Sequence, residues 1–329
     1  MRVTPSCDTL YSVIICARPF VQTDPAVVYN GADHVVVWSD LRFTGSHYWI
    51  VSSCVDTSGA VLDTGFCIGA QELRNECRPD IAFDGDRCFV VWYNYNEPFG
   101  VYGRFVNENG QPEDEIIKVA TTLAGYNVNP GITFAGGNYL VVWADKRPGF
   151  SDLDISGQFV SPQGELIGAQ LLIATGSNNQ LYPEVAYDGS IALVIWREAT
   201  SAIFGQRVYP DGGLCGSNFR ISDTLPYYRY NSGLDMSPAN YLVVWSETRV
   251  GETDIYGNVD LMTHVEESAV SVREWRGATI FSGRSAIPYA EGYRIYDVCG
   301  RDVTGRPVSC GIYFVEARDR IVQKIIRIR

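Results

Sequence analysis

Charged side chains recur at two places in this sequence, and each place predicts a different chemistry. The first lies just after a repeated tryptophan, in segments such as "NYLVVWADKR" from Asn138 and "YLVVWSETR" from Tyr241. Carboxylates and guanidinium groups there could bind sugars or peptides, or could pair with one another across a rim. The second lies just after a repeated proline, at Asp80 and Glu184. Two carboxylates there could do the acid and base work of a glycosidase, or could simply hydrate a channel mouth.

The unit that positions these residues occurs five times. Its tryptophans are separated by 54, 51, 53 and 49 residues, at Trp38, Trp92, Trp143, Trp196 and Trp245. In four copies a proline stands 13 residues before the tryptophan and a glycine seven before it. The proline opens a short strand, the glycine makes a hairpin turn, and the apolar run before the tryptophan predicts a strand buried on both faces. Four antiparallel strands at this period predict an all-β fold, a five-bladed β-propeller.

The fifth unit lacks its fourth strand, and a segment at the other end of the sequence matches that strand. "YSVIICARPFVQTDP" from Tyr11 aligns with "QLLIATGSNNQLYP" from Gln170. We therefore expect residues 11–17 to complete the last blade and close the ring, which would remove an exposed sheet edge. The propeller would span residues 1–262, and the repeat ends there.

The C-terminal segment carries "IYDVCGRDV" from Ile295, "GIYFVE" from Gly311 and "QKIIRIR" from Gln323. These pieces resemble the C-terminal sorting domains of proteins exported by the bacterial type IX secretion system. The resemblance implies a small β-sandwich-like domain over residues 263–329, passage across an outer membrane, and release or attachment at the cell surface. The repeat also resembles uncharacterised bacterial propeller repeats that often precede such tails, from which no activity carries over.

Composition excludes several classes of function. The net charge of -12 argues against nucleic acid as a partner, because phosphate binding needs a basic surface. No apolar run has the roughly 18 residues of a transmembrane helix. The three histidines show no paired metal-ligand spacing, and no phosphate loop or nucleophile elbow occurs. We expect neither a metal nor a cofactor.

Nine cysteines indicate an oxidising, extracellular compartment. Cys54 and Cys67 flank a turn at Gly59 and are candidates for a hairpin disulfide, and Cys299 and Cys310 are a second candidate pair. The others remain unassigned: Cys7, Cys16, Cys77, Cys88 and Cys215. Because nine is odd, at least one thiol is free or bonded to another molecule.

The loops that join the second and third strands vary most in length, and they lie on the same face as the loops between blades. Loops carried on a rigid scaffold often bind ligands. The candidate ligand-binding residues on this face are Asp40, Arg42, Tyr126, Asp145, Arg147, Tyr182, Tyr228, Glu247 and Arg249. The same charged residues could instead form a solvated rim.

The leading expectation is an extracellular, non-catalytic structural protein of a bacterial surface that self-associates through its C-terminal domain, head to tail, into filaments or a layer. The residues from Glu266 onward carry a net charge of +3 and the preceding part -15, which favours such a contact. The first alternative is a lectin-like propeller that binds surface glycans or peptides. The second is a glycan-active enzyme that uses Asp80 and Glu184.

Overall fold

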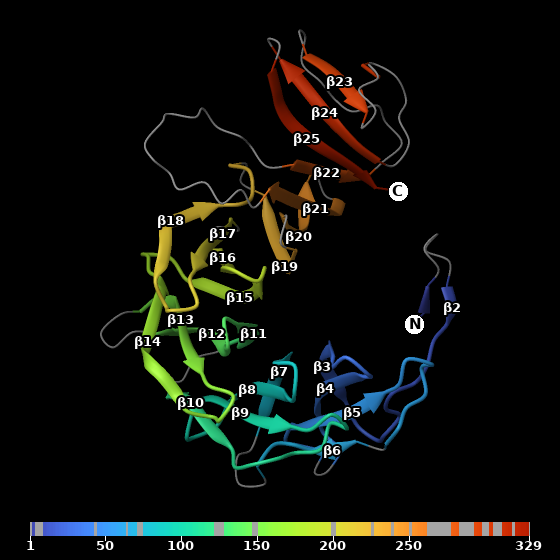
Figure 1. The fold of residues 1–329 in the computed structure, drawn as a ribbon, viewed down its shortest axis with the longest axis vertical. Coiled ribbons are helices and arrows are strands. Elements are labelled where there is room, and N and C mark those ends of the chain that lie inside the picture. Colours follow the sequence, from blue (N-terminus) through green and yellow to red (C-terminus); the bar gives the residue numbers. More distant parts are fainter. Residues whose placement is uncertain are drawn as a thin grey trace.

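The computed structural model describes residues 2–3, 9–42, 45–63, 65–70, 75–121, 128–146, 151–198, 202–224, 227–237, 240–249, 252–261, 278–282, 293–297, 303–304, 311–317 and 320–328. Every regular element within these ranges is a β-strand (Figure 1). Since they contain no helix, they offer no helical membrane span either. The predicted all-β class is confirmed.

Five sheets follow one another around a common axis, which confirms the five-bladed arrangement (Figure 1). Four of them are four-stranded and antiparallel. Blade 1 is β3 (Gln22–Tyr29), β4 (His34–Asp40), β5 (Trp49–Val55) and β6 (Phe66–Cys67); blade 2 is β7 (Glu76–Phe83), β8 (Cys88–Asn94), β9 (Gly100–Val106) and β10 (Ile117–Thr121); blade 3 is β11 (Gly131–Ala135), β12 (Asn138–Lys146), β13 (Leu153–Val160) and β14 (Leu166–Ala174); blade 4 is β15 (Gln180–Tyr187), β16 (Ala192–Glu198), β17 (Ile203–Val208) and β18 (Leu214–Arg220).

The apolar run before each tryptophan is buried on both faces because alternate residues pack on different neighbours. In β8, Val90 and Trp92 pack with blade 1, whereas Phe89, Val91 and Tyr93 pack with blade 3. Trp143, Trp196 and Trp245 likewise pack against the blade that precedes each of them in the sequence. The core is therefore a series of apolar seams between blades.

The hairpin between the first two strands of a blade turns at the predicted glycine. Gly85 has φ 105° and Gly189 φ 101°, a region that residues with a Cβ atom rarely adopt. A Cβ atom at either position would meet no other atom within 4 Å. Glycine is needed there for its backbone conformation and not for space.

Each of four innermost strands contains a bulge at the residue before the repeated proline or its equivalent. The register shifts in β3, β7, β15 and in β19 (Tyr228–Met236). The residues at these bulges have positive φ: Asp24, Arg78, Tyr182 and Asn231. Because a bulge redirects a side chain, this feature sets where the residues on either side of the proline lie.

The closure of the fifth blade differs from the prediction. Blade 5 contains β19, β20 (Asn240–Arg249) and β21 (Glu252–Leu261), and the strand beside β21 is β22 (Ala278–Ser282), not residues 11–17. At the N-terminus, β1 (Arg2–Val3) pairs with β2 (Thr9–Tyr11).

The N-terminal segment has a different role, and Trp38 supplies the physical reason. Unlike the other repeated tryptophans, Trp38 lies in an apolar cluster that contains no described residue of another blade. Ile15 and Cys16 cover it instead, together with Val36. The apolar residues that suggested a closing strand are used as a cover for the first blade.

The remaining described strands continue the sheet of blade 5. β22 pairs in parallel with β25 (Arg320–Ile328), which pairs with β24 (Gly311–Ala317), and β24 pairs with β23 (Tyr293–Asp297). The division into domains at residue 262 and the sandwich-like form of residues 263–329 stay predictions.

Candidate functional site

In blade 1, the acid and the arginine that follow the tryptophan bind each other. The Asp40 carboxylate is fully buried and accepts a hydrogen bond from Trp38 Nε1 at 2.7 Å. It also accepts hydrogen bonds from the backbone nitrogen and from Nε of Arg42, both at 2.7 Å. Such charge-assisted bonds hold the end of β4 in a fixed geometry. Of the two alternatives that the sequence left open, ligand binding or mutual pairing, the structure shows pairing for Asp40 and Arg42.

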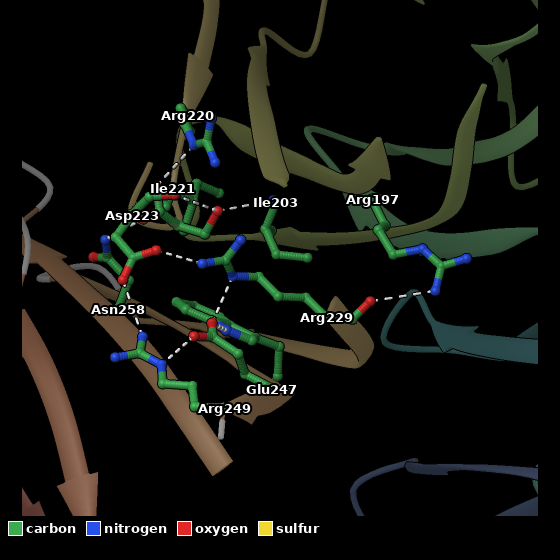
Figure 2. Close-up of polar contacts among 11 residues, drawn as sticks. Arg197, Ile203, Arg220, Ile221, Asp223, Arg229, Glu247, Arg249 and Asn258 are labelled. Carbon is green, nitrogen blue, oxygen red and sulfur yellow. Dashed lines mark hydrogen bonds and ion pairs between the residues drawn. The ribbon is translucent and has the colours of Figure 1, made fainter. Parts of the chain in front are cut away.

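The corresponding residues of blade 5 form a larger network (Figure 2). Glu247 Oε2 accepts hydrogen bonds from Trp245 Nε1 at 2.8 Å and from Arg229 Nε at 2.6 Å, and Oε1 accepts one from Arg249 Nε. Arg229 and Arg249 also pair with Asp223 in the segment that follows β18. The side chains of Arg229 and Glu247 have no exposed surface. We call Asp40 and Glu247, with these partners, the rim clasps.

Sequence reasoning misses Arg229 because an isolated arginine in a tyrosine-rich segment is normally expected at the surface. The other predicted ligand-binding residues are dispersed. Asp145 is buried in blade 3, Tyr182 lies under the Arg197 guanidinium at 4.7 Å, and Tyr228 is 75% exposed. Tyr126 and Arg147 lie outside the described residues. The structure thus joins Asp40 to Arg42 in blade 1 and Glu247 to Arg249 in blade 5. As a ligand site, this set stays a prediction.

The predicted hairpin disulfide is absent, since Cys54 and Cys67 are both free thiols. Cys67 stands opposite Val51 in the sheet, and the Cys54 carbonyl accepts a hydrogen bond from the Leu62 backbone nitrogen. The register therefore places the two cysteines at different levels of the hairpin, which near-symmetry about Gly59 could not reveal. Cys299 and Cys310 lie outside the described residues.

Asp80 and Glu184 each bond to the innermost strand of the next blade. Asp80 Oδ2 accepts a hydrogen bond from the Ile132 backbone nitrogen of β11 at 2.9 Å. Glu184 Oε1 accepts one from Ser232 Oγ of β19 at 3.4 Å. Both residues are half-buried and neither forms an ion pair with a described residue. We call them the channel carboxylates.

Gly131 separates the channel carboxylates. A Cβ atom at Gly131 would lie 3.3 Å from the Pro183 carbonyl oxygen and 3.6 Å from Glu184 Cα, so β15 comes close to β11 here. The residue after Gly131 is Ile132, the donor to Asp80. Because glycine carries no side chain, β11 places no bulky group between Asp80 and Glu184.

The surroundings of the channel carboxylates raise their pKa values to different extents. Burial raises the pKa of Asp80 to about 6, and hydrogen bonds from Ile132 and Ile81 oppose that rise. Burial raises the pKa of Glu184 to about 7, with a smaller contribution from the negative charge of Asp80. The two groups are therefore within electrostatic range of one another. Between pH 6 and 7 one carboxyl is largely protonated and the other largely ionised, which is the division that acid–base catalysis requires.

Among the described residues, no group of three histidine, cysteine or carboxylate side chains gathers as a metal ion would need. The expectation of no metal and no cofactor stays a prediction.

No family model matches the sequence, and no curated protein matches it either. Among solved structures, a protein of unknown function from Dyadobacter fermentans is similar, with a TM-score of 0.55, 13% identity, and coverage of 75% of this chain and 80% of that one. An N-acetylgalactosamine deacetylase from F. plautii is also similar, with a TM-score of 0.46 and 10% identity. The match covers 72% of this chain and 82% of that one. A family 43 β-xylosidase/α-arabinofuranosidase from a compost metagenome has a TM-score of 0.43 and 10% identity. That match covers 76% of this chain and 93% of the enzyme.

Two expectations from the sequence are wrong: that the chain is not an enzyme, and that it is a self-associating structural protein. The named proteins among the similar structures include glycoside hydrolases, a deacetylase and a prolyl endopeptidase, and nothing in the comparisons supports self-association. At these identities the likeness shows the fold alone and passes no activity to this chain. The chemistry open to this chain follows from its own channel carboxylates, whose pKa values are raised by burial.

Proposed function

We propose that this protein is a glycan-active enzyme that cleaves glycosidic bonds with Asp80 and Glu184. The observation that supports this proposal is the pair of half-buried carboxylates on either side of Gly131, with pKa values raised to about 6 and about 7. In an acidic protein, two carboxyl groups that titrate near neutrality, without an arginine partner among the described residues, are suited to proton transfer.

Glu184 has the higher pKa and is the proton donor in this proposal. At pH 6 to 7 a substantial fraction carries a proton, which it gives to the oxygen of the leaving sugar as the glycosidic bond breaks. Asp80 is ionised over more of this range and acts on the other side of the bond. It either removes a proton from the attacking water or attacks the sugar carbon itself.

Aromatic side chains where blades 1, 2 and 3 meet favour a sugar as the substrate. Tyr48, Tyr93 and Tyr95 line a hollow on the loop face of blade 2. Tyrosine rings offer a flat apolar surface with a polar end, which suits the alternating C–H and O–H groups of a sugar ring.

Turnover of a panel of polysaccharides and aryl glycosides tests the proposal. Asp80→Asn and Glu184→Gln keep the shape of each side chain and should each lower kcat/KM by about 100- to 10,000-fold. Asp235→Asn is the matched control, because Asp235 is an exposed carboxylate on another innermost strand. A wild-type chain that binds glycans without cleaving them would overturn the proposal in favour of a lectin-like propeller.

The pH profile gives a second readout. The rate should rise as Asp80 ionises near pH 6 and fall as Glu184 loses its proton near pH 7, giving a narrow bell. Glu184→Gln should remove the alkaline limb from the residual activity. A profile that is flat between pH 5 and 8 would contradict the assigned roles.

We further propose that the protein acts outside the cell, at the surface of a bacterium. The support is the resemblance of residues 263–329 to type IX sorting domains, together with the extracellular location of most polymeric glycans. Fusing residues 263–329 to a periplasmic reporter in a bacterium with that secretion system tests this. Reporter that stays in the periplasm would contradict it.

A further inference from the structure

Blade 2 departs from the repeat just after its tryptophan. Where blades 1 and 5 have an acid and then an arginine, this blade has "WYNYN" from Trp92, and Asn94 occupies the position of the acid. Asn94 Nδ2 bonds to the carbonyl oxygens of Asn96 and Pro98, so no rim clasp forms here. Asn94 and Asn96 replace the acid and the arginine, and the rings of Tyr93 and Tyr95 beside them meet edge to face at 6.2 Å.

These tyrosines line a hollow of about 380 Å³ shared by three blades. Such a volume is in the range of small-molecule binding sites. Blade 1 contributes the end of a loop, blade 2 the start of β7 and the end of β8, and blade 3 the segment before β11. The lining residues are Tyr48, Asn75, Cys77, Arg78, Tyr93, Tyr95 and Val128.

Arg78 supplies positive charge to this hollow. It occupies the bulge of β7 with φ 55°, and its Nη1 donates to Asn129 Oδ1 at the entry to blade 3. No described carboxylate forms an ion pair with Arg78, in contrast to Arg42, Arg229 and Arg249 in the rim clasps. A guanidinium group held by a neutral amide keeps donors for an anionic ligand.

The buried acid two residues before Arg78 contributes little negative charge to this hollow at neutral pH. Glu76 is fully buried, and its carboxyl oxygens accept hydrogen bonds from the backbone nitrogens of Ala70 at 2.9 Å and Ile50 at 3.4 Å. Burial raises the pKa of Glu76 to about 8, so the group is mostly protonated and neutral at pH 7. Asp24 bonds to Ser39 and Thr23.

We propose that this hollow binds an anionic sugar residue, carboxylated or sulfated, of the glycan on which the channel carboxylates act. The tyrosine rings would contact the sugar ring, and the Arg78 fork would take the anionic group in a bidentate bond. In a protein of net charge -12, attraction of such a glycan needs a local cation.

The position of Arg78 connects this inference with the proposed function, on which it rests. Arg78 and Asp80 lie on either side of Pro79 in the same bulge, and both bond to blade 3, through Asn129 and Ile132. A sugar held in the hollow therefore lies along the seam that contains Asp80. The acidic sugar would be the sugar unit next to the glycosidic bond that is cleaved.

Binding can be measured separately from cleavage by calorimetry on the full chain carrying Glu184→Gln. The probes are glucuronic acid, glucose 6-sulfate and glucose. The anionic sugars should bind more tightly than glucose. Adding Arg78→Gln should weaken their binding by about 10- to 100-fold and leave glucose unchanged, because one charge-assisted contact is lost. The two anionic probes show which group is preferred.

Two further variants keep the test decisive. Arg18→Gln removes the same charge from an exposed position outside the hollow and should change no affinity. Tyr95→Ala should weaken anionic and neutral sugars by similar factors, since it removes ring contact and not charge. Equal affinity for glucose and glucuronic acid, or an equal effect of Arg78→Gln and Arg18→Gln, would overturn the inference.

The outcome is distinct from a failure of the proposed function. Tight, Arg78-dependent binding of acidic sugars without any wild-type turnover would retain this site and reject the enzyme. Turnover of neutral glycans that depends on Asp80 and Glu184 but not on Arg78 would retain the enzyme and reject this site.

Discussion

The rim clasps and the channel carboxylates contain the same chemical group in opposite surroundings. Asp40 and Glu247 each accept a hydrogen bond from an indole nitrogen and from at least one guanidinium group. Among the described residues, Asp80 and Glu184 accept hydrogen bonds from neutral donors, the Ile132 backbone nitrogen and the Ser232 hydroxyl among them. Asp40 and Glu247 are therefore ionised structural groups, whereas Asp80 and Glu184 can exchange a proton near neutral pH.

This difference shows that the partners of a carboxylate, and not its position on an exposed-looking loop, decide its role. The acid that follows the tryptophan of blades 1 and 5 looks like a surface ligand site in the sequence. The acid that follows a repeated proline looks like part of a strand. The structure shows the opposite. A guanidinium partner neutralises the acid that follows the tryptophan, whereas burial without a described cation raises the pKa of the acid that follows the proline.

The largest effect should follow Glu247→Gln. Arg229 has no exposed side-chain surface, so losing the negative charge of Glu247 leaves a buried guanidinium group with one of its two described ion-pair partners, Asp223. Breaking one partner of a buried pair costs about 3–5 kcal/mol. Urea denaturation should show this loss in the free energy of unfolding. Glu184→Gln at pH 7 is the matched comparison. An equal loss of unfolding free energy in both variants would contradict the distinction between the rim clasps and the channel carboxylates.

An intermediate effect should appear as a pH dependence of stability. Burial raises the pKa of Glu184 from its ordinary value of 4.5 to about 7, so the folded state binds this proton more tightly than the unfolded chain does. Its stabilising contribution is therefore complete below pH 4.5 and is lost as the pH rises through about 7.

Glu184→Gln keeps the group neutral at every pH and isolates that contribution. Relative to the wild type, the variant should gain up to about 2–3 kcal/mol between pH 4.5 and 8.5. Denaturation at both pH values, with Glu252→Gln as an exposed control on β21, measures the gain. A difference between variant and wild type that is the same at both pH values would contradict the assigned environment.

The smallest effect should follow Asp40→Asn in the other rim clasp. Asparagine has one acceptor oxygen in place of two, so it can keep the bond from the Arg42 backbone nitrogen but not also the bond from Trp38 Nε1, and the Arg42 side chain keeps 9% exposure. The loss should be about 1.5–2 kcal/mol, the size of one lost charge-assisted hydrogen bond. Thermal unfolding against wild type checks it. A loss as large as that of Glu247→Gln would mean that burial of the arginine does not determine how much unfolding free energy is lost.

The sequence predicts the blades well because each blade depends on local rules. The glycine seven residues before the tryptophan adopts the positive φ of the turn at Gly85 and Gly189, and the apolar run fills two seams. The glycine recurs in four copies and the apolar run in all five, so they leave a period in the sequence. The innermost-strand positions of Asp80 and Glu184 follow from the same period.

What the sequence cannot predict depends on contacts between blades. The pKa of Asp80 depends on burial and on Ile132, 52 residues away, and no periodic signal reports that proximity. The role of residues 11–17 is a similar case. Their apolar pattern fits either a closing strand or a cover for Trp38, and only the packing of Ile15 and Cys16 distinguishes these. The hollow of blade 2 does leave a signal, the departure of "WYNYN" from the repeat.

The direction in which the tryptophans pack bears on how the chain is made. Trp92, Trp143, Trp196 and Trp245 each pack on the blade that precedes them, and Trp38 packs on Ile15 and Cys16, which precede it too. During synthesis the N-terminal part folds first. Each new blade can therefore bury its tryptophan on a surface that already exists, so the propeller can grow from the ribosome one blade at a time without exposing an indole that waits for later sequence.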